Sequence, residues 1–342
     1  MNLQALIETA QAMVADGKGL LAMDESPGTC NRRFEALGIA PSAEMRRAYR
    51  ELLLSTPELG SCISGVILCD ETFGQATAEG TTFVQLARDA GLLVGIKVDT
   101  GAKALALRSG EKVTEGLDGL RERLLAYVET GASFAKWRAV IAVNAVDGGH
   151  LPSAACIAAN AQALARYAAL CQEAGLVPII EPEVLMTGTH TLAHCQAVTE
   201  ALLREVFEAL TLQGVALEAL ILKPNMVIAG LAAPTQNTAD EVADATLQCL
   251  RRVVPAAVPG IAFLSGGQSG ELASSRLNAL HLRPRAPWPL SFSFARALQH
   301  PALDIWAGQD ANRAAAQKAL MHRARCNRVA LRGEYSAAME AQ

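Results

Sequence analysis

Short runs of apolar residues recur along the chain, and most are continuous rather than alternating with polar residues. The eight runs cover residues 19–24, 65–70, 92–98, 133–138, 176–181, 219–223, 260–265 and 289–294. Continuous Val, Ile, Leu and Phe runs of this length are typical of strands in a parallel sheet that is buried on both faces. The pattern therefore predicts eight parallel strands.

Amphipathic helical patterns separate these runs. Residues 117–130 and 153–174 each stop at a glycine, which is the residue that most often ends a helix in the left-handed conformation. Residues 41–44 open a further helix, and Thr238 and Glu241 have the spacing of a capping box. A helix is thus expected after nearly every strand.

Strand–helix alternation repeated eight times predicts an α/β fold, the (β/α)8 TIM barrel. An open doubly wound sheet is the alternative, but eight evenly spaced units fit a closed barrel better. We expect an extra N-terminal helix over about 2–16, the last barrel helix over 310–332 and a short tail over 334–342. No linker or low-complexity segment divides the chain, so we expect a single domain over 1–342.

The composition is that of a soluble globular protein, since 51% of the 342 residues are hydrophobic and 19% are charged. A net charge of -4 argues against a nucleic acid or a membrane surface as partner. The eight cysteines form no Cys-x-x-Cys pair and sit mostly among apolar residues, as reduced thiols do. We find no signal-peptide pattern and no membrane-spanning run, and we therefore expect a cytoplasmic protein.

Lys223 occupies the most informative position in the chain. It follows an apolar strand directly, and Pro224 ends that strand. Burial there disfavours the ammonium form, and a neutral amine can form a Schiff base with a ketone or an aldehyde. The alternative is a strand-end lysine that simply reaches solvent, and the rest of the chain decides between the two.

Other charged residues gather at the predicted strand ends, where a TIM barrel has its active site. They are Asp24, Lys97, Lys136, Arg138, Glu181, Glu183 and Lys223. Two lysines close to Lys223 would favour its neutral form further, and the carboxylates would supply general acids and bases. This pattern indicates Schiff-base chemistry.

Two further groups indicate anion binding. Ser265, Gly266 and Gly267 precede a helix that starts near Ser269, so their backbone N–H groups can face an anion. Ser293 and Arg296 follow from the eighth strand, and the loops after strands seven and eight of this fold often hold phosphate. The cationic pair Arg32 and Arg33 after strand one would hold a second phosphate, or it is a solvated helix start.

We predict no metal site and no cofactor. His190 and His194 are four residues apart and resemble half of a zinc site, but the sequence offers no third ligand nearby. Trp137 and Trp306 are interpreted as packing anchors rather than ligand platforms.

The chain resembles the class I fructose-bisphosphate aldolases, which form a Schiff base and use no metal. The resemblance runs from about Gly17 to Tyr335. The motifs that carry it are Leu21-Ala22-Met23-Asp24-Glu25-Ser26, Gly95-Ile96-Lys97-Val98-Asp99, Phe134-Ala135-Lys136-Trp137-Arg138, Ile180-Glu181-Pro182-Glu183, Leu222-Lys223-Pro224-Asn225-Met226 and Phe263-Leu264-Ser265-Gly266-Gly267-Gln268-Ser269.

The resemblance implies reversible cleavage of fructose 1,6-bisphosphate to dihydroxyacetone phosphate and glyceraldehyde 3-phosphate. Lys223 would form the Schiff base and Glu181 would move protons, while Asp24 and Lys136 would act beside the bond that breaks. Glu183 and Arg138 would shape the site. The residues implied for the 1-phosphate are Ser265, Gly266, Gly267, Ser293 and Arg296. Those implied for the 6-phosphate are Arg33, Ser26, Thr29 and Lys97. The resemblance also implies a homotetramer.

The chain departs from the family at several positions. Thr29 and Arg32 stand where the family has serine and lysine, and Ala295 replaces a glycine before Arg296. Residues 70–72 read Asp-Glu-Thr where the family has His-Glu-Thr. The long C-terminal tail with its functional tyrosine is expected to be absent.

Two alternatives remain open. The first is a Schiff-base aldolase that prefers another ketose phosphate, such as fructose 1-phosphate or sedoheptulose 1,7-bisphosphate. The second is a sugar-phosphate-binding or scaffold protein that has lost catalysis, although the intact set Asp24, Lys136, Glu181 and Lys223 argues against it.

Overall fold

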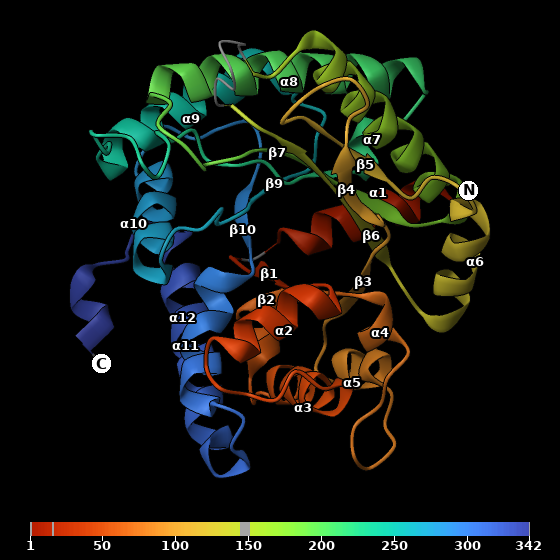
Figure 1. The fold of residues 1–342 in the computed structure, drawn as a ribbon, viewed down its shortest axis with the longest axis vertical. Coiled ribbons are helices and arrows are strands. Elements are labelled where there is room, and N and C mark those ends of the chain that lie inside the picture. Colours follow the sequence, from red (N-terminus) through yellow and green to blue (C-terminus); the bar gives the residue numbers. More distant parts are fainter. Residues whose placement is uncertain (1, 16, 144–150, 342) are drawn as a thin grey trace.

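The computed structural model describes residues 2–15, 17–143 and 151–341, and it confirms the predicted closed barrel (Figure 1). Parallel strands pair in the order β1-β10-β9-β8-β7-β6-β3-β2, and β2 pairs with β1 to close the ring. The open doubly wound sheet is therefore excluded. The barrel strands are β1 Gly19–Met23, β2 Ile63–Leu68, β3 Leu93–Lys97, β6 Phe134–Ile141, β7 Val177–Val184, β8 Ile221–Leu222, β9 Ile261–Phe263 and β10 Leu290–Phe294.

Helices surround this barrel (Figure 1). In the described residues they are α1 Leu3–Met13, α2 Pro27–Glu35, α3 Ala43–Leu54, α4 Asp70–Phe73, α5 Phe83–Asp89, α6 Leu120–Thr130, α7 Ala154–Ala174, α8 Leu192–Leu212, α9 Ala239–Val253, α10 Gly270–His281, α11 Arg296–Trp306 and α12 Arg313–Ala330. Short 3-10 turns lie at Leu59–Ser61, Leu217–Ala219, Asp310–Asn312 and Ala337–Ala341. None of the helices in these ranges is both long and apolar enough to cross a membrane.

The predicted helix ends are confirmed at the positions that carry a capping signal. Gly131 and Gly175 follow α6 and α7 with φ of 113° and 86°, the left-handed conformation that glycine adopts readily. Thr238 and Glu241 form the expected capping box at the start of α9. The expected N-terminal helix is α1, and position 16 of that prediction lies outside the described residues.

Strand lengths were predicted less well than strand positions. Strands β6 and β7 are eight residues long, whereas the prediction stopped three residues earlier in each. Strand β8 contains only Ile221 and Leu222, because Pro224 has no N–H to continue the ladder. The antiparallel hairpin of β4 Gly101–Ala104 and β5 Lys112–Glu115 was not predicted, since its short strands are partly exposed and carry no apolar run.

Helix α1 packs against the end of the barrel at which the strands begin. Its buried residues Leu6, Ala10 and Met13 belong to one apolar cluster with Leu20 and Ile221 of the barrel. A larger cluster lies between the strands and the outer helices. The predicted packing roles of the tryptophans agree with this arrangement, because Trp137 and Trp306 are buried and stack near Tyr167 and Tyr49. The opposite end of the barrel is left for the charged residues.

Glycines in the strands make room for aromatic rings inside the barrel. A Cβ atom at Gly95 of β3 would lie 2.0 Å from Cε2 of Phe134 in β6, and a Cβ at Gly19 would lie 2.5 Å from the Phe292 ring. Real side chains do not approach so closely, so these rings fill the interior only because the glycines have no side chain.

We predict that Gly95→Ala destabilises the fold by about 1–3 kcal/mol, because the added methyl group overpacks the barrel against Phe134. The matched control is Gly74→Ala, where the nearest atom to the new Cβ would be 3.8 Å away and φ is −88°. Denaturant unfolding of both variants measures the difference. Equal stability of the two variants would contradict this packing account.

Candidate active site

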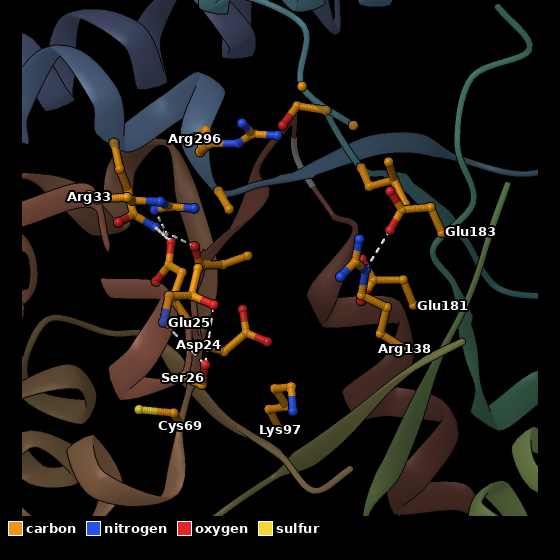
Figure 2. Close-up of a pocket in the computed structure, with 18 of the residues that line it drawn as sticks. Asp24, Glu25, Ser26, Arg33, Cys69, Lys97, Arg138, Glu181, Glu183 and Arg296 are labelled. Carbon is orange, nitrogen blue, oxygen red and sulfur yellow. Dashed lines mark hydrogen bonds and ion pairs between the residues drawn. The ribbon is translucent and has the colours of Figure 1, made fainter. Parts of the chain in front are cut away.

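A cavity of about 1240 Å³ opens where the strands end. Its lining contains every site residue that the sequence predicted, from Asp24 after β1 to Arg296 at the start of α11. Figure 2 shows ten of the lining residues labelled, with Asp24, Glu25 and Arg33 on one side and Arg138, Glu181 and Glu183 on the other. The structure thus brings the predicted residues together, and their individual roles stay predictions.

Four buried charged side chains form a connected chain at the floor of this cavity. The Nζ atom of Lys136 lies 2.6 Å from Oδ2 of Asp24 and 2.9 Å from Oε2 of Glu181. The other oxygen of Glu181, Oε1, lies 3.2 Å from Nζ of Lys223. None of these side chains is more than 10% exposed. Glu181 is therefore shared by two lysines, whereas Asp24 pairs with Lys136 alone among the residues that the structure describes.

The barrel backbone sets this arrangement. Asp24 follows β1 directly, and the register of β6 with β7 pairs Lys136 with Ile179, two residues before Glu181. The backbone N–H of Lys223 donates a 2.8 Å hydrogen bond to the carbonyl of Ile180, the residue before Glu181. Because pairing with β7 continues as far as Lys223, its side chain is held next to Glu181.

Burial and ion pairing act in opposite directions on these groups. Burial alone would raise the pKa of Asp24 and of Glu181, but the nearby lysines outweigh it and hold both pKa values below their ordinary range. Burial alone would lower the pKa of Lys136, but Asp24 and Glu181 raise it above its ordinary value. Lys136 is therefore a fixed ammonium group between two carboxylates.

A second set of pairs borders the cavity. Nε of Arg138 lies 2.5 Å from Oε2 of Glu183 (Figure 2), and this contact raises the arginine's pKa although burial opposes the effect. Nζ of Lys97 lies 2.5 Å from Oδ1 of Asp99. Asp99 also accepts hydrogen bonds from the backbone N–H groups of Gly101 and Arg138, so it ties the β4–β5 hairpin to β6.

The predicted anion loop lies beside an arginine. Gly266 and Gly267 have φ of 54° and 93°, which an L-residue rarely adopts, and a Cβ at Gly267 would lie 3.2 Å from Nη2 of Arg296. The hydroxyl of Ser293 is buried and has no hydrogen-bond partner in the described ranges, and this residue also lines the cavity. Backbone N–H groups, a free hydroxyl and a guanidinium group together suit a phosphate.

The residues predicted for the second phosphate gather at the start of α2. Ser26 caps this helix, and the hydroxyl of Thr29 accepts hydrogen bonds from Ser26 and from Arg32. Nη1 of Arg33 lies 2.5 Å from Oε1 of Glu25, and the arginine remains 22% exposed (Figure 2). Arg33 is thus oriented by a carboxylate but still faces the cavity.

Sequence reasoning missed the groups that hold these cations in place. Glu25 binds Arg33 through one oxygen and the buried Arg50 through the other at 2.8 Å, and Gln299 donates to it at 3.0 Å. The carboxylate of Asp99 holds Lys97 in the same way, by accepting a hydrogen bond from its ammonium group. The signal for Glu25 was its place beside Asp24 at a strand end, but Gln299 and Arg50 carried no local signal.

The family departures have local explanations in the structure. Ala295 has a negative φ of −103°, so the backbone at this position is outside the left-handed region that favours glycine. Asp70 accepts a 2.6 Å hydrogen bond from the hydroxyl of Tyr127. The hydroxyl of Tyr335 donates to Glu340, and neither residue lines the cavity.

Histidines do not assemble a metal centre in the cavity. His190 is buried with no partner for either ring nitrogen, and His194 begins the next helix. Within the described ranges, one group could hold a metal: His322, Cys326 and Glu340, none of which lines the cavity. Arg323 already pairs with both carboxylate oxygens of Glu340.

We predict that Lys136→Met costs about 3–5 kcal/mol of stability near pH 7, because it leaves two buried carboxylates without their main partner. The folded-state pKa values of Asp24 and Glu181 are depressed, so the stabilisation from Lys136 is complete above their ordinary values near 4 and is lost progressively as the pH falls from there through the lowered folded-state values. Denaturant unfolding at pH 7 and near pH 2.5 measures the penalty.

The matched control is Arg121→Met, which removes the exposed pair with Glu173. It should change stability little at either pH. A Lys136→Met penalty of the same size at both pH values would show that the loss comes from packing rather than from charge.

Comparison with known proteins agrees with the geometry. Residues 5–342 match the family profile described as "Fructose-bisphosphate aldolase class-I". The chain is 53% identical to a "Probable fructose-bisphosphate aldolase class 1" of Xanthomonas campestris over 98% of this chain and 99% of that protein. It is 51% identical to a "Fructose-bisphosphate aldolase, non-muscle type" of the lamprey Lethenteron camtschaticum over 96% of this chain and 90% of that protein.

A solved structure gives the same answer for the fold. A fructose-bisphosphate aldolase from Plasmodium falciparum, solved in complex with TRAP and a small-molecule inhibitor, superposes with a TM-score of 0.95 at 44% identity. The match covers 98% of this chain and 96% of that one. This chain therefore belongs to the class I fructose-bisphosphate aldolase family.

Proposed function

We propose that this protein is a class I fructose-bisphosphate aldolase that reversibly cleaves fructose 1,6-bisphosphate to dihydroxyacetone phosphate and glyceraldehyde 3-phosphate. Family membership and the names of its relatives support this activity. The floor of the cavity supports it independently, because it places two buried lysines on one buried carboxylate.

The difference between those lysines carries the proposal. Lys136 contacts two carboxylates, at 2.6 and 2.9 Å, and is therefore stabilised as an ammonium ion. Among the described residues, Lys223 has a single carboxylate contact, at 3.2 Å, and that carboxylate is shared. A Schiff base requires an amine that has lost its proton. Lys223 is thus the nucleophile, and Lys136 is a fixed cation that holds the neighbouring carboxylates ionised.

Glu181 is suited to move protons for Lys223. The amine adds to the C2 ketone of the sugar to give a carbinolamine, and loss of water from this intermediate gives an iminium ion. Both steps need a proton donor and acceptor next to the amine nitrogen, and Glu181 lies there. The carboxylate contacts Lys223 directly, so the proton can pass between them without an intervening group.

Asp24 and Lys136 are suited to assist carbon–carbon cleavage. A base takes the proton of the C4 hydroxyl, the C3–C4 bond breaks, and its electron pair moves to the iminium nitrogen to form an enamine. The aldehyde product carries the C4 oxygen away. We assign Asp24 as the base because it is buried beside the ammonium of Lys136, which keeps it ionised. Protonation at C3 and hydrolysis then release the ketone.

Arg138 and Glu183 shape the site beside this chemistry. Their 2.5 Å contact fixes both side chains at the wall formed by β6 and β7. Glu183 is also the carboxylate we propose to assist protonation of the enamine at C3, because it follows Glu181 by two residues and lines the same cavity.

Two phosphate subsites fit the two ends of the substrate. We assign the 1-phosphate to Ser265, Gly266, Gly267, Ser293 and Arg296, and the 6-phosphate to Arg33, Ser26, Thr29 and Lys97. The loop glycines and the helix start after them supply N–H donors. Arg33 supplies a guanidinium group that can exchange its contact with Glu25 for one with phosphate, since Arg50 continues to neutralise Glu25.

We also propose that the protein works in the cytoplasm as a homotetramer, as its family does, with no cofactor and no nucleic-acid or membrane partner. All eight cysteines are buried and free of disulfides, which agrees with a reducing compartment.

We predict that the protein cleaves fructose 1,6-bisphosphate, that exhaustive chelation leaves the rate unchanged, and that Lys223→Arg lowers kcat about 10³-fold or more because the nucleophile is lost. A coupled triose assay measures all three. The matched control is Lys103→Arg in the exposed β4–β5 hairpin, which should keep full activity. Loss of cleavage on chelation, with recovery on adding zinc, would mean a different class of aldolase.

We predict different substrate patterns for the two arginines. Arg33→Ala should lower kcat/KM for fructose 1,6-bisphosphate by a factor that corresponds to about 2–4 kcal/mol of lost transition-state stabilisation. It should affect fructose 1-phosphate little, because that sugar lacks the 6-phosphate. Arg296→Ala should affect both sugars. Steady-state kinetics on both substrates tests the assignment, and equal losses for Arg33→Ala on the two sugars would refute it. The same assay measures which ketose phosphate the enzyme prefers.

A further inference from the structure

A buried arginine lies behind the phosphate loop. Arg276 sits in the middle of α10, the helix that follows Ser265–Gly267, and it is 3% exposed. Its Nη1 donates a 2.9 Å hydrogen bond to Oε1 of Gln268, and its Nη2 lies 3.4 Å from the carbonyl oxygen of Asn237. Its Nε has no partner in the described part of the chain. Both acceptors that the structure places on this guanidinium group are neutral.

Comparison with the other buried arginines makes this unusual. Across the ranges that the structure describes, three arginines are classed as buried: Arg50, Arg276 and Arg323. Arg50 pairs with Glu25 and Arg323 pairs with Glu340. Arg276 makes no ion pair with any described carboxylate. Burial lowers the pKa of Arg276, yet arginine keeps its proton in proteins, so the charge is uncompensated.

A single neutral side chain connects this charge to the loop. Gln268 accepts from Arg276 through Oε1, and its Nε2 donates a 2.9 Å hydrogen bond to the carbonyl of Ser265. The backbone N–H of Gln268 donates to the same carbonyl at 3.0 Å. Arg276 thus fixes which way the Gln268 amide faces, and Gln268 holds the residue that begins the phosphate loop.

We propose that Arg276 is a positioning residue for the phosphate subsite: it holds the Ser265–Gly267 loop through Gln268 and supplies a buried positive charge whose counter-anion is the phosphate dianion of the substrate. A buried charge without a partner is unfavourable in the free protein, and it is screened little by salt. Both effects favour a doubly charged anion in front of the loop. The inference rests on the assignment of this loop to phosphate under the proposed function.

Arg276 could instead be a purely structural clamp, since its contact with Asn237 also links the loop before α9 to α10. A clamp acts only through the hydrogen bonds of the guanidinium group, whereas the charge attracts phosphate and is kept by lysine. The variants must therefore separate charge from hydrogen bonding, and the ligands must separate phosphate from the rest of the sugar.

The test uses Arg276→Gln, which removes the charge, and Arg276→Lys, which keeps it. Isothermal calorimetry measures the Kd of inorganic phosphate, and kinetics measure KM and kcat for fructose 1,6-bisphosphate. We expect Arg276→Gln to raise both the Kd and KM about tenfold, because the attraction between the guanidinium charge and the phosphate is lost, with kcat changed less than about threefold. Arg276→Lys should stay within about threefold of the wild type.

Trapping of unphosphorylated dihydroxyacetone on Lys223 by borohydride gives the control, because this ketone has no phosphate. It should proceed equally in all three proteins. Equal loss of dihydroxyacetone trapping and phosphate binding would mean a structural clamp and overturn the proposal. A tenfold rise in the phosphate Kd of Arg276→Lys would also overturn the proposal. This measurement remains decisive even if Arg276→Gln does not fold.

The phosphate titration also keeps this inference separate from the proposed activity. If the wild type binds inorganic phosphate but does not cleave fructose 1,6-bisphosphate, the activity is wrong and the role of Arg276 is still measured. If the wild type cleaves the sugar and Arg276→Gln binds phosphate normally, the activity stands and the role of Arg276 is wrong.

Discussion

The site depends on one interaction, the contact of the Lys136 ammonium with both Asp24 and Glu181 at the floor of the barrel. Without it, two carboxylates less than 10% exposed would each face the cost of burial alone. With it, both stay ionised and their pKa values lie low. Because Lys136 takes up most of this negative charge, Lys223 is left with one shared contact, and the two lysines become chemically different.

The barrel backbone holds the charged residues of this interaction in place. Asp24 directly follows β1, and Lys136 and Glu181 lie within β6 and β7, so sheet hydrogen bonds hold the backbone around each charge. Apart from Arg138, the residues of these three strands are all buried. The N–H of Lys223 extends the pairing of β8 with β7 past the end of the strand. The same organisation repeats at the rim, where Glu25 is held between Arg33 and Arg50, and Asp99 is held by Lys97 and two backbone N–H groups.

The sequence predicted the fold and the charged strand ends that line the cavity, because both follow from local patterns, while the other lining residues were predicted from the family resemblance. Apolar runs that end abruptly at Asp24, Lys97 or Lys223 indicate a strand and its charged end at once. The pairings could not be predicted, since nothing local says that Lys136 contacts Asp24 while Lys223 does not. Arg50, Gln299 and Arg276 were missed for the same reason: each lies inside a helix, and its partner comes from a distant segment or from an earlier loop. The β4–β5 hairpin was missed because its short strands lack an apolar run.

The two floor lysines have different roles in this mechanism, with Lys223 as the nucleophile and Lys136 as the fixed cation. The most direct measurement is borohydride reduction of the protein in the presence of dihydroxyacetone phosphate, followed by peptide mass spectrometry. The account predicts one added triose per chain, on Lys223, with Lys136 and Lys97 unmodified. Triose on Lys136 or Lys97 while Lys223 remains unmodified would contradict it.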